Sequence, residues 1–236
     1  IAMTQTSLLI GLCLLGAVSA HFLSHTHSIP KSPLTKNYPG PTCTANDQAK
    51  TKTCLDAYFA AYGIDTTNGA PEFLYFMDLT NSVIQQYGTT GFDIYCDFET
   101  TLETCLGDLM TTPCMNSEAF TKMYGMNETE AVNYATSYAV EAYTCQNLDI
   151  TKAYYPCIAG HQDDIAPAII DCTKKMMSEF EGATDMCVPY DHYITCLENH
   201  YVDFCDEGIR SYICSTEEIA INFTMNGQCA ASLHKC

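Results

Sequence analysis

The stretch YCDFETTLETCLGDLMTTPC, Tyr95–Cys114, carries three cysteines nine positions apart, and MCVPYDHYITCLENHYVDFC, Met186–Cys205, carries three more at the same spacing. The inner Thr104–Leu106 of the first stretch (Thr-Cys-Leu) recurs in the second as Thr195–Leu197. The second stretch is the first displaced by 91 residues. We call each of these stretches, with its three evenly spaced cysteines, a cysteine ladder. The occurrence of two such ladders indicates a duplicated unit held by disulfides.

The same displacement of 91 residues relates Cys54 to Cys145 and Cys145 to Cys236. We therefore predict two tandem cysteine-rich helical repeats of about 91 residues, the first at 43–144 and the second at 145–236. The five cysteines outside the displacement pattern have no counterpart, which predicts that the two repeats differ in their disulfide sets; they are Cys43, Cys157, Cys172, Cys214 and Cys229.

The first residues have the features of a secretory leader. Leu8–Leu15 is a short apolar run, and Val18–Ala20 supplies the small residues that signal peptidase needs. The sequence predicts a signal peptide at 1–20, cleaved before His21. A tail at 21–42 with four prolines and few apolar residues is expected to be flexible.

Removal of the leader takes Cys13 with it and leaves an even number of cysteines. In an exported chain an even number favours complete disulfide pairing, here as seven bridges. No Cys-x-x-Cys motif occurs, so a structural zinc site is not expected, and spacing alone does not fix the connectivity. The predicted disulfide cysteines are Cys43, Cys54, Cys96, Cys105, Cys114, Cys145, Cys157, Cys172, Cys187, Cys196, Cys205, Cys214, Cys229 and Cys236.

Composition agrees with an acidic, secreted, extracellular protein. Asn127 and Asn222 open N-glycosylation sequons, which an exported chain would use. Acidic residues outnumber basic ones 28 to 10, a formal net charge of −18 that disfavours nucleic acids as partners. No stretch after the leader approaches the length of a membrane span, so no membrane insertion is predicted.

Hydrophobic periodicity predicts an all-α, disulfide-rich helical array. A helix carrying Cys54 should end at Gly63, and a second should have Pro71 in its first turn and end at Gly88. Asn127 and Glu130 form a capping-box-like start for a third helix. Its apolar stripe contains Ala131, Tyr134, Ala135, Tyr138, Ala142 and Cys145. Ser215 with Glu218 repeats the capping pattern, which predicts a helix from there to Gly227.

Residues nine apart on one helix point to opposite sides, because nine steps of about 100° add up to a half turn beyond whole turns. Cys96 and Cys105 should therefore connect one helix to neighbours on both flanks. Pro113 predicts that a helix ends between Cys105 and Cys114. The same spacing forms neither a metal cage nor a paired reactive dithiol. Matching glycines, Gly69 with Gly160 and Gly91 with Gly182, suggest turns shared by the two repeats.

Three groups of polar residues are candidates for chemistry, and for each a polar surface is the simpler interpretation. They are His161 with Asp163 and Asp164, Asp191 with His192, and His200 with Asp203. No hydrolase, zinc-protease or calcium-loop motif accompanies them. The residues His21, His25 and His27 are a further candidate, as a transition-metal site. We predict no catalytic residues, no cofactor and no metal site.

The ladders at Tyr95–Cys114 and Met186–Cys205, each with the inner Thr-Cys-Leu, resemble the secreted cysteine-rich helical domains expanded in nematodes and catalogued as domain of unknown function 19. The resemblance covers cysteine spacing and implies no activity and no catalytic residues.

The sequence as a whole predicts a secreted, non-enzymatic glycoprotein that binds an extracellular protein or glycan. An alternative is a carrier for a small apolar ligand in a cavity lined by aromatic and Met side chains, with Tyr134 and Tyr138 as the first candidates for its wall. A secreted hydrolase is a third hypothesis, which requires His161 or His192 to meet carboxylates in a cleft.

Overall fold

The structure is a computed structural model that describes residues 43–225 and 227–236. The predicted signal peptide at 1–20, the tail at 21–42 and its three histidines lie outside the described residues. The described part is all-α, as predicted, with nine α-helices, three short 3₁₀ helices and no strand. The α-helices are α3 (Ala45–Ala61), α4 (Phe73–Tyr87), α5 (Thr89–Leu106), α6 (Ser117–Tyr124), α7 (Glu128–Gln146), α8 (Leu148–Gly160), α9 (Gln162–Phe180), α10 (Cys187–Phe204) and α11 (Arg210–Thr224), and the 3₁₀ helices are η1 (Gly107–Thr111), η2 (Pro113–Met115) and η3 (Glu207–Ile209).

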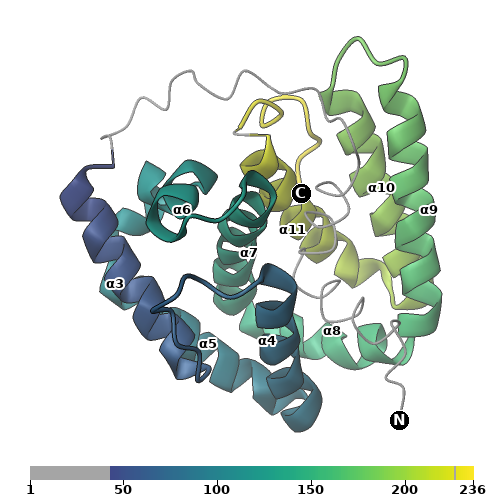
Figure 1. Cartoon of the computed structure of the whole chain (residues 1–236). Helices are drawn as coiled ribbons and strands as arrows, with labels where there is room; N and C mark the ends of the chain where they lie inside the picture. The colour runs from purple at the N-terminus through teal and green to yellow at the C-terminus, as the bar shows by residue number, and fades with distance from the viewer. Residues whose placement is uncertain (1–42, 226) are drawn as a thin grey trace.

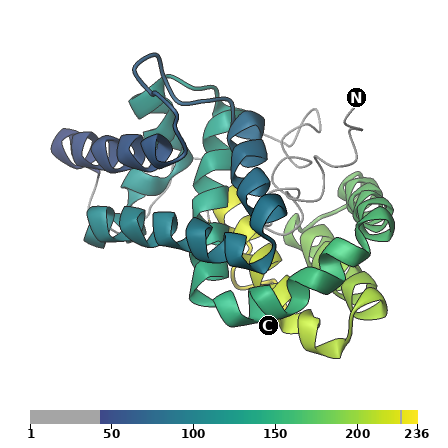
Figure 2. The ribbon, with the colours of Figure 1, turned by 90° about the horizontal axis from the view of Figure 1, so that it is seen from below.

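The helices form two groups joined through the middle of the molecule. Helices α3 to α6 occupy one side, and α9 and α10 pack together on the other side (Figure 1). Between the two groups, α7, which follows α6 in the chain, packs along α11, which follows α10. Helix α8 contacts α5, α7, α9 and α10 and so connects the two groups, as the view from below shows (Figure 2).

Local sequence explains several helix ends. Thr44 and Asp47 form a reciprocal capping box at the start of α3, and Gly63 follows its last turn with φ of 77°. The Asn127 side chain caps α7 by accepting from the Glu130 N–H. Glu130 does not complete a capping box, because its carboxylate accepts a hydrogen bond from the Phe73 N–H at 2.7 Å and so holds the start of α4.

The predicted start of the last helix is wrong. Helix α11 begins at Arg210, directly after η3, and Ser215 lies inside it. The 3₁₀ turn runs straight into the helix, so no side-chain cap is needed at Ser215.

All fourteen predicted cysteines are paired. Cys96 connects α5 to α7 and Cys105 connects α5 to α3, which confirms that residues nine apart reach opposite flanks. Helix α5 ends before Cys114, as Pro113 predicted. The seven disulfides are Cys43–Cys114, Cys54–Cys105, Cys96–Cys145, Cys157–Cys205, Cys172–Cys196, Cys187–Cys229 and Cys214–Cys236.

The two halves differ in their disulfide sets, as predicted, because only the second has the Cys214–Cys236 bridge, but the other three bridges of each half share one pairing order. In chain order, the first six cysteines pair first with fifth, second with fourth and third with sixth. The next set has the same order when the additional Cys214–Cys236 bridge is left out. The counterparts of Cys43 and Cys54 are therefore Cys157 and Cys172, two of the cysteines that the sequence pattern had left without a match.

The displacement of 91 residues relates only the three ladder cysteines of each half. Cys145 pairs with Cys96, and the cysteine in the same place of the second pairing order is Cys229. The spacing of 91 residues had matched Cys145 with Cys54 and Cys236, and the disulfides do not follow that match. The boundary placed after Thr144 falls within α7, one residue before the cysteine that ties this helix to α5.

The matching glycines do not form shared turns. Gly69 has a φ of 115°, but Gly160, Gly91 and Gly182 do not have positive φ. Gly91 is needed for a different reason. A Cβ there would lie 2.6 Å from the Ile84 Cα and 2.7 Å from the Val83 carbonyl oxygen, so glycine lets α5 pass close to the backbone of α4.

Aromatic rings fill the core of the first half. Tyr134 and Tyr138 project from α7 onto Phe120 of α6, with ring centroids 6.0 and 5.6 Å from it in stacked arrangements. Tyr58 of α3 meets Tyr138 edge to face at 5.6 Å, and Phe76 of α4 meets Tyr58 at 5.9 Å. Such pairs contribute about 0.5–1.5 kcal/mol each beyond their burial.

Candidate functional site

A cluster of buried polar groups lies where α3, α5 and α7 meet. The Tyr58 hydroxyl donates to Glu141 Oε2 at 3.2 Å, and the Ser137 hydroxyl donates to Glu141 Oε1 at 2.5 Å. Glu99 and Glu141 are both fully buried. We call the following residues the acid–tyrosine cluster: Glu99, Glu141, Ser137, Tyr58, Tyr62, Tyr95 and Tyr138.

Burial shifts the acids of this cluster toward their protonated forms. Desolvation raises the pKa of Glu99 well above its ordinary value, and the nearby acidic groups of Glu141 and Glu103 raise it further. Desolvation also raises the pKa of Glu141, although hydrogen bonds from Ser137 and Tyr58 oppose it. Neither carboxylate oxygen of Glu99 has a hydrogen-bond partner among the described residues. The cluster therefore holds protons that exposed carboxylates would release.

The acid–tyrosine cluster is closed to substrates. Glu99, Glu141 and Tyr95 have no exposed surface, and Tyr58 and Tyr138 expose 3% and 2%. A general acid must reach its substrate to act, so this pair of carboxyls does not form an open catalytic site. Its physical effect is on the pH dependence of folding.

A second cluster ties the C-terminal segment to α10. The backbone N–H of His234 donates to Asp191 Oδ1 at 2.7 Å, and its Nδ1 lies 2.9 Å from the same oxygen. The other ring nitrogen, Nε2, lies 3.0 Å from Glu198 Oε1. Arg210 Nη1 approaches the second oxygen of Glu198 at 3.3 Å. His234 therefore bridges two carboxylates on one face of α10.

The bridge favours a charged imidazole. Burial by itself would lower the pKa of His234, but hydrogen bonds to Glu198 and Asp191 outweigh burial and raise it. Glu198, Cys214 and His234 place three metal-ligating atoms within 4.8 Å of one another. The arrangement suits an ion pair better than a metal, because both ring nitrogens already face carboxylates and Cys214 is bonded to Cys236.

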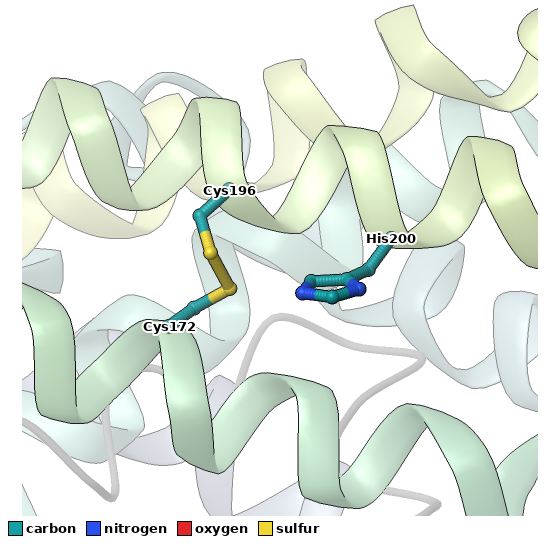
Figure 3. Close-up of side chains that lie close together, drawn as sticks. All are labelled: Cys172, Cys196 and His200. Carbon is teal, nitrogen blue, oxygen red and sulfur yellow. A yellow bond between two sulfur atoms is a disulfide. The ribbon is translucent and has the colours of Figure 1, made fainter.

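A third cluster lies between α9 and α10. Cys172 of α9 and Cys196 of α10 form a disulfide, and the His200 ring lies beside it (Figure 3). The three potential ligand atoms lie within 4.8 Å of one another. His200 also stacks on Phe204, with ring centroids 6.2 Å apart. In the disulfide form the sulfurs are not thiolates, so the cluster has one available metal ligand.

The other candidates from the sequence meet single acids on the surface. His161 Nδ1 lies 3.6 Å from Asp164 Oδ2 and His192 Nδ1 lies 2.7 Å from Glu179 Oε2, and both contacts are on the surface. Asp163 and Asp203 are exposed. Asp191 contacts His234 and not its neighbour His192, so the convergence that a hydrolase requires is not seen at these residues.

Sequence reasoning missed Glu99, Glu141 and His234. The first two had a signal, because Glu141 follows Tyr138 by three positions on the apolar stripe of α7, and Glu99 lies three positions after Cys96. An acidic residue at a core position of a helix indicates a buried carboxyl. His234 had no such signal, since its partners lie 43 and 36 residues away.

The side chains proposed to line an apolar cavity are packed into the core. Tyr134 and Tyr138 stack on Phe120, and the Tyr134 hydroxyl donates to the Pro71 carbonyl at 2.9 Å. A shallow hollow of about 420 Å³ lies elsewhere, at the turn between α9 and α10. No aromatic or Met side chain lines it, and its lining includes Glu179 and Asp185.

None of the helices in the described residues has the length and apolar character required to cross a membrane. No family model, curated protein or solved structure matches this chain. The resemblance to domain of unknown function 19 therefore stays a prediction, and the evidence for function comes from the chain's own residues.

Proposed function

We propose that this chain is a secreted, non-enzymatic protein that binds an extracellular protein or glycan through the exposed tyrosines of α4. The disulfide-rich helical fold is of the kind that extracellular proteins use, because disulfides persist in an oxidising environment. The binding surface that we propose lies on α4.

The observation that carries the location is the character of α4. In a chain with net charge −18, this helix of 15 residues has one acidic residue, Asp78, and no basic residue. Tyr75 and Tyr87 are 57% and 52% exposed, the most exposed large apolar side chains of the described residues. Binding surfaces are enriched in tyrosine and depleted of charge at their centres.

The remaining polar groups support binding over catalysis. The acid–tyrosine cluster is closed to substrates, and His234 is held between Asp191 and Glu198. Both of these clusters therefore have structural roles.

The test is a binding screen of the glycosylated chain, produced by secretion from a eukaryotic host, against a glycan array and a library of extracellular proteins. For any ligand found, replacing both Tyr75→Ser and Tyr87→Ser should weaken binding by about tenfold or more, as loss of interface tyrosines does. Val188→Ser is the matched control, since Val188 is 45% exposed on a different helix and should leave affinity unchanged.

Two results would count against the proposal. Equal binding by the double variant and the native chain would remove α4 as the surface. A reproducible catalytic activity lost on replacing one polar residue would remove the non-enzymatic assignment.

A further inference from the structure

The Cys172–Cys196 disulfide has a neighbouring histidine that its counterpart in the first half lacks. Cys54–Cys105 holds the same place in the repeated connectivity and also joins two adjacent helices. Four residues after Cys196 stands His200, whereas four residues after Cys105 stands Leu109, which packs against the core.

His200 is placed to act on the sulfurs. A separation of four residues puts it on the same face of α10 as Cys196, one turn further along. A ring nitrogen lies within 4.8 Å of both sulfur atoms (Figure 3). Cys172 is buried, but Cys196 and His200 are half-buried, so a small thiol can approach from their side.

We propose that Cys172–Cys196 is a reducible disulfide, and that its two cysteines bind Zn²⁺ together with His200 once they are reduced. This inference is independent of the binding surface on α4.

The reduction balances with a dithiol as the reductant. One thiolate of the dithiol attacks the Cys196 sulfur, the S–S bond breaks, and Cys172 leaves as a thiolate that takes up a proton. The second thiol of the reductant then displaces Cys196 and closes the oxidised cyclic disulfide. Two electrons and two protons pass to the protein, and the His200 imidazole beside the sulfurs can donate a hydrogen bond to each departing thiolate.

The ligand set fits zinc after reduction. Zn²⁺ displaces the two thiol protons and takes a lone pair from the neutral His200 ring, which makes a Cys₂His site with water as the fourth ligand. Tetrahedral bonds of about 2.0–2.3 Å place ligand atoms about 3.4–3.8 Å apart. The three atoms already lie within 4.8 Å, so side-chain rotations close the site without moving the helices.

The two helices do not depend on the disulfide for their packing. Phe180 of α9 meets Tyr190 of α10 edge to face at 5.1 Å, and Ile169 and Ile194 are buried in the same core. A reduced Cys172–Cys196 pair is therefore expected to leave the fold in place.

The first experiment is brief reduction of the native protein with dithiothreitol at pH 7, followed by alkylation with N-ethylmaleimide and peptide mass mapping. Cys172 and Cys196 should be labelled at least about threefold faster than Cys54 and Cys105, given how strongly exchange depends on the leaving thiol. Burial alone predicts the opposite order, because Cys105 is exposed and Cys196 is half-buried. Faster labelling of Cys54 and Cys105, or an unchanged rate in His200→Gln, would overturn the redox part.

The second experiment adds Co²⁺, as a spectroscopic substitute for zinc, to the partly reduced protein without oxygen. The expected result is a thiolate-to-cobalt charge-transfer band that Zn²⁺ removes and that the disulfide form lacks. His200→Gln should weaken binding by about tenfold or more, with circular dichroism checking that the helices persist. Absence of the band in folded, reduced protein, or equal affinity in His200→Gln, would overturn the zinc site.

Discussion

The Tyr58 hydroxyl donates a hydrogen bond to the Glu141 carboxyl, which is 3.2 Å away and 83 residues later in the chain. Both side chains are buried in the core. With Glu99 beside them, these groups put two carboxyls where water does not reach. The energetic consequence is that folding favours their protonated forms.

Glu99→Gln should stabilise the protein at pH 7.5 by about 1–3 kcal/mol, because the neutral amide removes the cost of burying an acid that has no hydrogen-bond partner among the described residues. The folded pKa of Glu99 is raised above the unfolded value, so its carboxyl costs stability as pH rises from about 4.5 toward the folded pKa. Below about pH 4 the acid is protonated in both states, and the variant should match the native chain. Urea unfolding from pH 4 to 8 measures this. Asp97→Asn, on the exposed side of the same helix, is the control, and a loss of stability in Glu99→Gln at pH 7.5 would refute the account.

His234→Gln should weaken the packing of the C-terminal segment against α10 at acidic pH and have little effect at high pH, while the Cys187–Cys229 and Cys214–Cys236 bridges keep the segment attached. The folded pKa of His234 is raised, so its ion pairs stabilise the fold below about pH 6.5 and are lost as pH rises through the folded pKa. The side chain is one-third exposed, which limits the effect to less than about 1 kcal/mol. Proton NMR titration of the His234 ring and hydrogen exchange of 227–236 test this. An apparent pKa below 6.5 for the His234 ring would contradict the bridge.

Gly91→Ala should destabilise the protein by about 1–3 kcal/mol, because the added methyl group meets backbone atoms that cannot move independently. Gly160→Ala is the matched control, since nothing lies within 4 Å of a Cβ at that position in α8. The control should be neutral or gain up to about 1 kcal/mol from helix propensity. Thermal unfolding measures the stability of both variants. An equal change in stability for the two would mean that α4 and α5 are not in close contact.

Non-reducing peptide mapping of the native protein should recover the pairing order first–fifth, second–fourth, third–sixth in both halves. Replacing Cys96 and Cys145 by Ala should cost about 4 kcal/mol, because that bridge closes a loop of 49 residues. A peptide linking Cys145 to Cys196, which a strict displacement by 91 residues requires, would contradict the structure.

Of the two sequons, Asn127 should carry a glycan and Asn222 should not. Asn127 is exposed, and its cap uses only Oδ1, which leaves the amide nitrogen free. Asn222 is half-buried in the last turn of α11, with its Oδ1 enclosed. Mass spectrometry after enzymatic deglycosylation reads both sites. Thr129→Ala should abolish the modification and Thr224→Ala should not, and the reverse pattern would refute the assignment.

The sequence by itself determined the local structure and the chemistry of the cysteines. Gly63, Gly88 and Asn127 mark helix ends through backbone conformation and capping, which depend on a few neighbouring residues. The nine-residue spacing fixed the opposite directions of Cys96 and Cys105 because one helix carries both. Complete pairing was predicted from the even number of cysteines that follow the predicted signal peptide.

Only the tertiary structure decided which cysteines pair and which polar groups meet. When the cysteines are matched by their place in the pairing order, as Cys54 with Cys172, the number of residues between the matched cysteines is not constant. The reason is that the loops and helices before each ladder differ in length. His234 meets Asp191 and Glu198 only after two disulfides and the packing of α11 bring the C-terminal segment back to α10. Contacts between residues distant in sequence depend on the path of the whole chain, and helical periodicity contains no information about that path.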